Sequence, residues 1–427
     1  MRLIIEDVRS FVRRHVIPIK ALTLVTGENS SGKTTLLASF AAVNDSVGFP
    51  FRPRFNEPPY SLGNYDTIAT FKGGSYGRAE SFSLGYVQPD RAVGGVTELV
   101  ATYVGSEGLV QLSSLAIKSK ASEYRVRFSQ ASGESQVVIE GEKDGRPFEP
   151  ETISDDDEIP AALSGTGIES FYNLLMLASR RRSAKNSNIR QKVLLELAQL
   201  RLQLPYGRTL SIAPIRTKPR RTYDEITEEF SPEGEHVPFV LSNLLADSKS
   251  KAIIERFGKE SGLYTKLDVR RLGKHLGDPS QVMVTGSNRS ANLIDVGYGV
   301  SQVLPVIVQC LMTTRQNVLL LQQPEVHLHP RAQAALGSLF VDLVVDGNKQ
   351  FIIETHSDYI IDRVRMEVGK GRIPAADVSI LYLEKDRFET TPYEISLSES
   401  GDICHAPPSY RDFFLQEELN LLERAER

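Results

Sequence analysis

The fold is decided by residues 22–34, which read LTLVTGENSSGKT. The apolar and β-branched run at 22–26 predicts a buried strand, and residues 27–34 match the pattern G-x-x-x-x-G-K-[ST]. The glycines let backbone N–H groups converge on phosphate oxygens, and the helix that starts near Lys33 adds partial positive charge. The alternative is a glycine-containing turn that arises by chance, but such a turn would not have to lie between a predicted strand and a predicted helix. The stretch is therefore predicted to be a phosphate-binding loop.

The side chains of this loop have distinct expected roles. Lys33 is expected to reach the β- and γ-phosphates of ATP, and Thr34 is expected to ligate Mg²⁺. ATP and Mg²⁺ are thus the expected cofactors. The predicted nucleotide-binding residues of the loop are Gly27, Glu28, Asn29, Ser30, Ser31, Gly32, Lys33, Thr34 and Thr35.

Outward from the loop, the sequence predicts an α/β protein whose nucleotide-binding fold is split by other elements. Short apolar runs predict strands at 3–5, 17–19, 65–71, 81–87, 110–117, 124–128 and 136–139, the later ones in an antiparallel sheet. After residue 265, strands are predicted at 318–321, 350–353 and 378–383, with a helix at 332–345. The predicted domains are 1–150 with the loop and an antiparallel lobe, 151–264 as a helical and basic insertion, and 265–427 with the remaining motifs and an amphipathic tail at 412–422.

The insertion carries charge patterns but no chemical motif. An acidic break at 155–158 precedes two segments with helical periodicity, 167–178 and 189–204. Around the gap between these segments lies a basic cluster made of Arg180, Arg181, Arg182, Lys185, Arg190 and Lys192. This cluster is either a solvated helix end or a contact for DNA or a partner protein.

A second candidate phosphate site lies at residues 295–302, which read DVGYGVSQ. Gly297 and Gly299 lead to Ser301 and Gln302, directly before an apolar helix predicted at 303–312. A serine that caps this helix would offer its hydroxyl and the backbone N–H groups to an anion. The alternative is a glycine-rich turn that caps a core helix. One bound nucleotide does not need two complete phosphate-binding sites from the same subunit.

Two further apolar strands end in polar residues. Residues 317–330 read NVLLLQQPEVHLHP, which places Gln322, Gln323 and Glu325 after a buried strand. Residues 351–357 read FIIETHS, which places His356 after another. These residues are candidates for the chemistry of the site.

Taken in order, these motifs resemble those of ABC-type, AAA-annotated ATPases of the OLD and SMC-like branch. GYGVSQ followed by LP looks like the signature motif, QQPEVHLHP resembles the Walker B segment, and THS resembles the switch histidine. Residues 212–216 (IAPIR) and 219–223 (PRRTY) also look like a family element, without an assigned role. The resemblance covers about 1–100 and 265–420. It implies an ABC-type P-loop fold with an antiparallel β-subdomain and an inserted helical region.

The resemblance also implies roles for the site residues. The signature of one subunit, with Ser301, covers the γ-phosphate held by its partner, which implies a homodimer or higher homo-oligomer. His356 is implied to sense the γ-phosphate in its own subunit. Position 322 normally holds a carboxylate for Mg²⁺, and position 323 often holds another that polarises the attacking water.

Here both of these positions hold glutamine. An amide oxygen can hydrogen bond to a Mg²⁺-bound water, but it cannot accept a proton as a general base. Three explanations stay open: hydrolysis is slow, Glu325 supplies the base, or the chain carries a deliberate Glu→Gln substitution that traps ATP. A zinc site at His327 and His329 is an alternative to an ordinary turn, although no Cys or third His lies nearby.

Bulk properties limit the class of protein. The chain has 427 residues, 41% hydrophobic composition and a net charge of −4, so any contact with nucleic acid needs a local basic patch. Its two cysteines form no CxxC pair, which argues against a disulfide framework. Residues 1–14, MRLIIEDVRSFVRR, contain no long apolar region before a small-residue cleavage site, so we expect no secretory leader, and no later run approaches the length needed to cross a bilayer. We expect a cytoplasmic protein without a membrane partner.

The resemblance implies a switch in which ATP joins two subunits and product release lets them part. A stand-alone ATPase of this type resembles the sensor or scaffold subunits of bacterial anti-phage systems, whose effector nuclease or toxin is a separate protein. The sequence has neither the acidic cluster of a fused toprim nuclease nor a zinc-hook CxxC. The alternative is a DNA-repair or chromosome-maintenance ATPase that acts directly on DNA. A membrane transporter ATPase is disfavoured, because HLHP and THS resemble the soluble branch.

Overall fold

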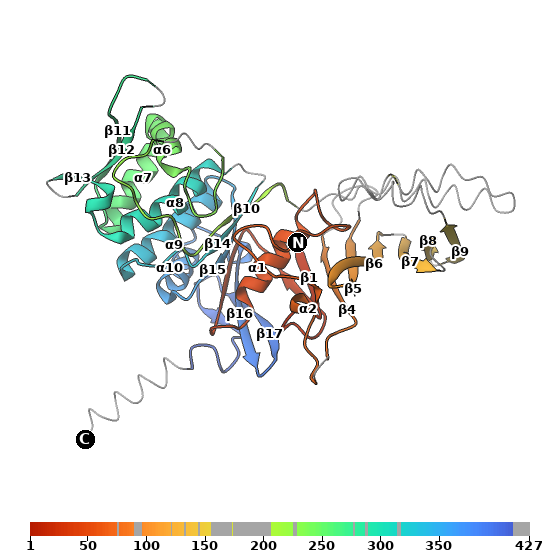
Figure 1. The fold of residues 1–427 in the computed structure, drawn as a ribbon. Helices are drawn as coiled ribbons and strands as arrows, with labels where there is room; N and C mark the ends of the chain where they lie inside the picture. The colour runs from red at the N-terminus through yellow and green to blue at the C-terminus, as the bar shows by residue number, and fades with distance from the viewer. Residues whose placement is uncertain are drawn as a thin grey trace. The chain divides into compact units, whose positions relative to one another are not determined.

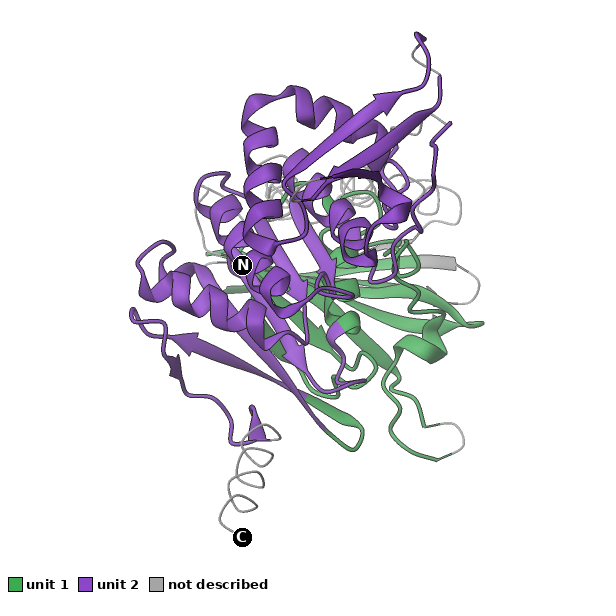
Figure 2. Cartoon of the chain, turned by 90° about the vertical axis from the view of Figure 1, so that its left-hand side faces the viewer, with its two compact units in different colours: residues 1–18, 34–209, 386–390 green, residues 19–33, 210–385, 391–427 purple. Residues whose placement is uncertain are grey.

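The computed structural model describes residues 1–74, 77–88, 96–120, 122–131, 134–143, 146–154, 173, 206–224, 229–275, 278–286, 289–313 and 317–412. The chain divides into two compact units (Figure 2). Unit 1 consists of residues 1–18, 34–209 and 386–390, and unit 2 consists of residues 19–33, 210–385 and 391–427. The domain boundaries predicted near 150 and 264 stay predictions.

Unit 1 is built on an eight-stranded sheet in the order β2-β1-β4-β5-β6-β7-β8-β9 (Figure 1). Its strands are β1 (Arg2–Glu6), β2 (His15–Pro18), β4 (Ser81–Val87), β5 (Glu98–Ser106), β6 (Leu109–Lys118), β7 (Ser122–Ala131), β8 (Glu134–Lys143) and β9 (Arg146–Ser154). Among the residues of this unit that the structure describes, the helices are α2 (Tyr65–Ile68) and, from Thr34 on, α1 (Lys33–Val43). Neighbouring strands are antiparallel throughout, which confirms the predicted antiparallel sheet.

The strand predicted at 65–71 is wrong, because this segment begins with α2. The Asn64 side chain accepts a hydrogen bond from the backbone N–H of Thr67 at 3.2 Å and so caps the helix. The Tyr65 hydroxyl donates to the carbonyl oxygen of Ala79 at 3.0 Å and anchors the first turn. These bonds outweigh the β-propensity of Tyr, Thr and Ile on which the prediction rested.

Unit 2 is built on a seven-stranded sheet in the order β10-β14-β15-β3-β16-β17-β18. Its strands are β3 (Leu22–Gly27), β10 (Thr209–Ile212), β14 (Val318–Gln322), β15 (Gln350–Glu354), β16 (Val378–Asp386), β17 (Glu389–Leu397) and β18 (Ile403–Cys404). The four strands β14, β15, β3 and β16 run parallel, so their carboxyl ends meet at one edge. Ligands of such sheets bind at this edge. The strands predicted for this sheet are confirmed.

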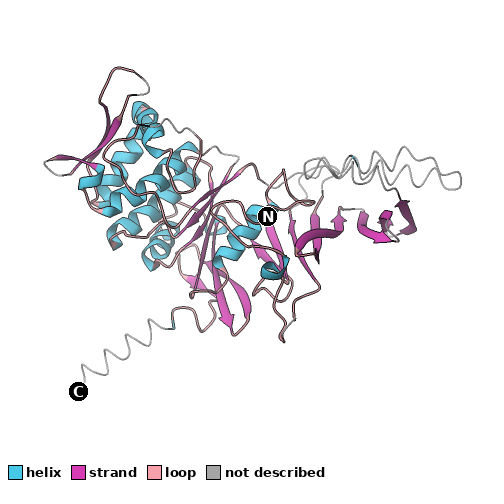
Figure 3. Cartoon of the chain, viewed as in Figure 1, coloured by secondary structure: helices cyan, strands magenta, loops and turns pink. Residues whose placement is uncertain are grey.

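The helices of unit 2 gather beside this sheet (Figures 1 and 3). They are α6 (Val237–Ala246), α7 (Ser248–Ser261), α8 (Tyr298–Met312), α9 (Pro330–Val345) and α10 (Asp358–Gly369), with the 3₁₀ turns η1 (Leu293–Asp295) and η2 (Ala375–Asp377). A small antiparallel sheet consists of β11 (Lys266–Arg271), β12 (Ser280–Thr285) and β13 (Ser290–Asn292). The helix predicted at 332–345 is confirmed as α9.

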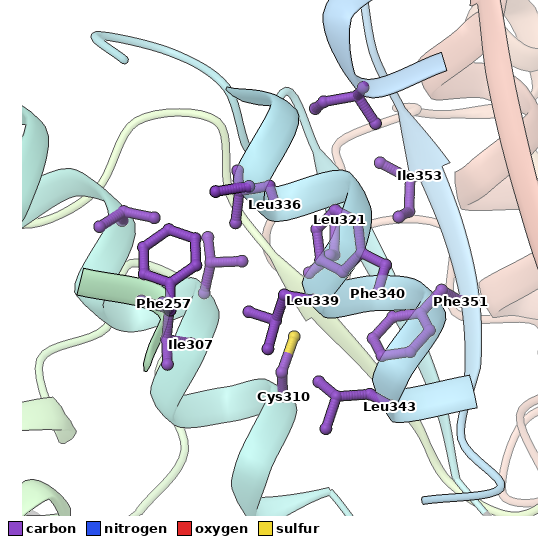
Figure 4. Packing of buried hydrophobic residues seen from close by; sticks show 14 of the residues in the cluster. Phe257, Ile307, Cys310, Leu321, Leu336, Leu339, Phe340, Leu343, Phe351 and Ile353 are labelled. Atoms are coloured by element: carbon purple, nitrogen blue, oxygen red, sulfur yellow. The ribbon is translucent and has the colours of Figure 1, made fainter. Parts of the chain in front are cut away.

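Apolar side chains join these helices to the sheet (Figure 4). Phe257 of α7 and Ile307 of α8 are buried in this core, and the rings of Phe340 and Phe351 lie 5.4 Å apart. Cys310 is fully buried among them, and burial raises the pKa of its thiol to about 12. The thiol therefore packs as a neutral, apolar group.

Several predictions fall outside the described residues. They are the acidic break at 155–158, the helical segments at 167–178 and 189–204, the basic cluster at 180–192, and the tail beyond residue 412. Within the part of the chain that the structure does describe, no helix has the length and apolar character to cross a membrane.

Candidate nucleotide-binding site

The phosphate-binding loop turns sharply after β3. Gly27 has a φ of 143°, and a Cβ atom there would lie 2.4 Å from the carbonyl oxygen of Leu383 in β16. Gly32 has a φ of 95°, in the left-handed region that favours glycine. Residues 28–30, between them, are exposed. The loop therefore needs both glycines, and it presents its tip to solvent.

Lys33 lies inside this loop and is only 4% exposed. Its Nζ donates hydrogen bonds to the carbonyl oxygens of Gly27 at 3.0 Å and of Glu28 at 2.6 Å. Burial lowers the pKa of the Lys33 ammonium, and the carboxylates of Glu354 and Glu28 oppose this shift. The loop's own carbonyls thus hold a buried cation, and a phosphate group can replace them.

Parallel strands bring three of the predicted motifs to one edge. β3 ends at Gly27, β14 ends at Gln322 and β15 ends at Glu354, and Gln322 and Glu354 are register partners. Glu354 is 4% exposed, and its carboxylate acts electrostatically on Lys33. The sequence motifs do not single out Glu354. Its only signal is a carboxylate at the end of an apolar strand, two residues before His356.

The two glutamines after β14 have different surroundings. Gln322 is 5% exposed, and its Oε1 accepts no hydrogen bond from the described residues. Gln323 has a φ of 43°, and its N–H donates to the carbonyl oxygen of Glu354 at 2.8 Å. A buried acceptor without a donor costs about 1–3 kcal/mol. Gln322 therefore offers an amide oxygen to a ligand that can donate a hydrogen bond, such as a metal-bound water.

Glu325 and His356 connect the ends of β14 and β15. The backbone N–H of His356 donates to Glu325 Oε1 at 2.7 Å, while Oε2 accepts no hydrogen bond from the described residues. Burial raises the pKa of the Glu325 carboxyl, opposed by its hydrogen bonds and by Arg216. Partial desolvation and the Lys33 ammonium lower the pKa of the His356 imidazole, so this ring is neutral at pH 7.

The segment at 295–302 leads into α8 in a way that corrects the sequence prediction. The helix begins at Tyr298, and Gly297 occupies the cap position without a side-chain cap. Ser301 therefore lies within the first turn, 5% exposed, and its hydroxyl donates to the carbonyl oxygen of Tyr298 at 2.9 Å. The prediction that Ser301 caps the helix is wrong, because residues 298–300 already adopt helical backbone.

This segment packs against the turn that follows β14. The ring of Tyr298 lies edge-on to His327 with centroids 5.5 Å apart, and a Cβ atom at Gly299 would lie 3.1 Å from the His327 carbonyl oxygen. The Nδ1 atom of His329 accepts from the N–H of Arg331 at 3.3 Å and caps α9. Both histidines thus have structural roles in the turn. Across the described ranges, no group of three or more His, Cys, Asp or Glu side chains can hold a metal ion.

Arg216 is a buried residue of this region to which the sequence gives no role. It is 3% exposed, and its guanidinium donates to the carbonyl oxygens of Gln302 at 3.3 Å, Gln322 at 3.2 Å and Gln323 at 3.1 Å. Its only sequence signal is the IAPIR segment at 212–216. Arg216 therefore joins the start of α8 to the end of β14.

Comparison with known proteins adds evidence for the type of domain. Residues 185–361 match the AAA ATPase domain family. This AAA ATPase match includes the segments at 295–302, 317–330 and 355–357, and it supports an ATPase. No curated protein matches the chain. The prediction of a mixed α/β fold of the P-loop, ABC type is confirmed.

Solved structures of SMC heads also match the chain, at low identity. The SMC head domain from Thermotoga maritima is 12% identical, with 93% of this chain and 98% of that chain covered and a TM-score of 0.37. The SmcHead bound to the C-winged helix domain of ScpA is 13% identical, with coverage of 93% and 98% and a TM-score of 0.41. The Smc head domain with an extended coiled coil, from Pyrococcus furiosus, is 12% identical, with coverage of 100% and 99% and a TM-score of 0.39.

Proposed function

We propose that this chain is an ABC-type, SMC-like ATPase that binds Mg²⁺–ATP, hydrolyses it slowly and dimerises around it. The observation that carries the proposal is the position of Lys33, a buried cation inside a glycine-turned loop at the carboxyl edge of parallel strands. A triphosphate has the charge and the oxygen atoms to take the place of the two carbonyls that hold the ammonium.

Each residue at this edge has a proposed task. Lys33 binds the β- and γ-phosphates, and backbone N–H groups of the loop orient them. Thr34, an exposed residue of α1, and Gln322 would hold Mg²⁺, which neutralises phosphate charge when it is bound. The neutral Gln322 amide gives the metal less charge than a carboxylate would. We therefore expect that the metal is held mainly by the phosphates and retains several waters.

Slow hydrolysis is expected because positions 322 and 323 hold no base, while the Glu354 carboxylate at this edge interacts electrostatically with Lys33. Neither Gln322 nor Gln323 can accept a proton. Glu325 is the proposed base, because one of its oxygens is free of hydrogen bonds from the described residues and burial raises the pKa of its carboxyl above the ordinary value. The Glu325 carboxylate is held by the backbone of His356, and the neutral His356 ring can report on a γ-phosphate in the same subunit.

Dimerisation is proposed from the second phosphate site. Gly297, Gly299, Ser301 and Gln302 lie at the N-terminal end of α8, and the positive end of a helix favours an anion. In the proposed dimer this end faces the ATP held by the other subunit. ATP binding then joins the subunits, and hydrolysis releases them.

The biological role that we propose is that of a sensor or scaffold subunit for a separate effector nuclease or toxin in anti-phage defence. This role rests on the family resemblance. Direct action on DNA, as in repair or chromosome maintenance, is the competing outcome. Co-purification of the native complex tests the choice: an effector protein in the complex favours defence, whereas DNA-stimulated turnover with salt-dependent DNA binding favours action on DNA.

A further inference from the structure

The guanidinium of Arg216 is shared between two elements that carry different motifs. One side donates to the carbonyl oxygen of Gln302 in α8, and the other donates to the carbonyl oxygens of Gln322 and Gln323 at the end of β14. The planar fork of arginine suits this arrangement, because it directs donors in several fixed directions at once. A movement of α8 relative to β14 would have to break these bonds.

Arg216 also places a positive charge in the interior of unit 2. Burial lowers its pKa to about 10, so the group stays charged at pH 7, and Glu325 is the carboxylate that acts on it. Glu325 is itself 8% exposed. A buried charge that loses its counter-charge is strongly destabilising. The two residues therefore stabilise each other's charged forms.

The chain that follows Arg216 is fixed to the same region a second time. Arg221 binds both carboxylate oxygens of Asp295 at 2.9 and 2.6 Å, and its carbonyl oxygen accepts from the Asn292 side chain at 2.9 Å. Asp295 is the first residue of the segment at 295–302, which contains the signature-like motif. Residues 216–221 thus contact this segment near both of its ends, at Asp295 through Arg221 and at Gln302 through Arg216.

We propose that Arg216 is a positioning residue that couples the signature end of α8 to the end of β14, the strand that leads to Glu325. The inference rests on the proposed function for the roles of those two groups, but the coupling is a property of the chain without nucleotide. This proposal gives the IAPIR segment a role: through Arg216, it fixes the start of α8 relative to the end of β14.

The first test is a double-mutant cycle on unfolding of the nucleotide-free chain. Arg216→Met and Glu325→Gln each leave one buried partner without its counterpart, whereas the double variant removes both. We expect the double variant to be more stable than the sum of the single changes by about tenfold or more in the unfolding equilibrium constant. Additive effects would overturn the coupling. If Arg216→Met does not fold, Arg216→Gln provides the same cycle with a smaller loss of hydrogen bonds.

A matched control uses an arginine that pairs with a different buried carboxylate. Arg372 binds Asp342, which is 7% exposed, at 2.5 Å. Arg372→Met combined with Glu325→Gln should give additive effects, because the two residues share no partner. Non-additivity of the same size in this control would show that the first cycle reports general loss of stability.

The second test addresses α8. Arg216→Lys keeps a positive charge, but a single ammonium cannot serve the carbonyls of both elements. We expect unchanged ATP affinity in the monomer and weaker ATP-dependent dimerisation by light scattering. Dimerisation equal to that of the unaltered chain would overturn the link to α8. A chain that binds no ATP would instead overturn the proposed function, and the unfolding cycle would still decide the coupling.

Discussion

Gln322 and Glu354 occupy paired positions at the ends of β14 and β15, and both side chains are buried. The residue at position 322 thus lies beside a carboxylate that interacts electrostatically with Lys33. A neutral amide there avoids a further negative charge directly beside Glu354. The same pairing determines how a carboxylate at position 322 would affect stability and ATP turnover, with and without a metal ion.

We predict that Gln322→Glu raises ATP turnover and makes the chain more dependent on Mg²⁺. The added carboxylate lies next to Glu354, so without metal the repulsion should lower the melting temperature, and Mg²⁺–ATP should restore it. Phosphate-release kinetics and thermal unfolding, each with and without Mg²⁺, measure both effects. Gln281→Glu on β12, in the separate small antiparallel sheet, is a control glutamine outside the edge, and it should leave the Mg²⁺ dependence as it is. A Gln322→Glu variant with unchanged turnover at saturating Mg²⁺ would contradict the metal role of position 322.

Gln323→Glu tests the base position separately. If the base limits the rate, this change should raise turnover, by up to the 10²- to 10⁴-fold that a general base typically contributes. Phosphate-release kinetics measure the change, and Glu325→Gln in the unaltered chain should lower the remaining rate. Fast turnover by the chain as it stands would mean that Glu325 already serves as an efficient base and that hydrolysis is not slow.

The raised pKa of Glu325 predicts a pH-dependent effect on stability. A carboxyl whose pKa is raised by folding contributes stability below its unfolded pKa, and this contribution is lost as the pH rises through the folded pKa. Gln mimics the protonated form at every pH. The melting temperature of Glu325→Gln relative to the unaltered chain should therefore rise as the pH increases from about 4 to 8. Thermal unfolding over this range measures the difference; a constant difference would show that folding does not shift the pKa of this carboxyl, and a falling one would show that folding lowers it.

Ser301 provides a test of the proposed dimer. Ser301→Arg should leave ATP binding by the monomer intact and abolish ATP-dependent dimerisation, because the added bulk and charge occupy the start of α8. Since Ser301 is 5% exposed, Ser301→Ala serves as a milder change that removes only the hydroxyl. Ser242 of α6, whose hydroxyl donates to Phe239 at 3.0 Å in the same way, is the matched control for Arg and Ala substitutions. Light scattering that still detects an ATP-induced dimer of Ser301→Arg would exclude the trans role.

Much of unit 2 could be predicted from the sequence because its signals are local. The apolar runs of β3, β14 and β15 are continuous, as expected for parallel strands buried on both faces. The loop from Gly27 to Lys33 needs glycine at defined positions, and this requirement appears directly in the pattern. Gln322 and His356 are assigned to one site by the resemblance of their segments to family motifs, and the parallel pairing of β14 with β15 brings the ends of these two strands to one edge.

The features that could not be predicted are of two kinds. Some depend on contacts between segments far apart in the sequence, and others depend on whether a short segment forms a helix instead of a loop or a strand. The role of Arg216 depends on its hydrogen bonds to three carbonyl groups that lie 86 to 107 residues further along the chain. In the sequence, Glu354 is only the last residue of an apolar strand. Its place at the site becomes clear from its register with Gln322 in the structure. The sequence predicts the start of α8 too late in the chain, because the two glycines in the segment at 295–302 indicate a loop. In the structure, Tyr298 and Gly299 are already helical. The helix at Tyr65 depends on a cap at Asn64 that β-propensity ignores.

The central claim, that Lys33 and its loop bind ATP, is tested most directly by calorimetric titration with Mg²⁺–ATP. Lys33→Ala should lose affinity by about 10- to 100-fold or more, because a charged donor to the phosphates is removed. The matched control is Lys349→Ala, which removes another buried lysine held by two carbonyl oxygens, those of Cys310 and Leu311, at the start of β15 and away from the loop. That variant should lose stability and keep its affinity for ATP. Equal ATP affinity in Lys33→Ala and the unaltered chain would contradict the account.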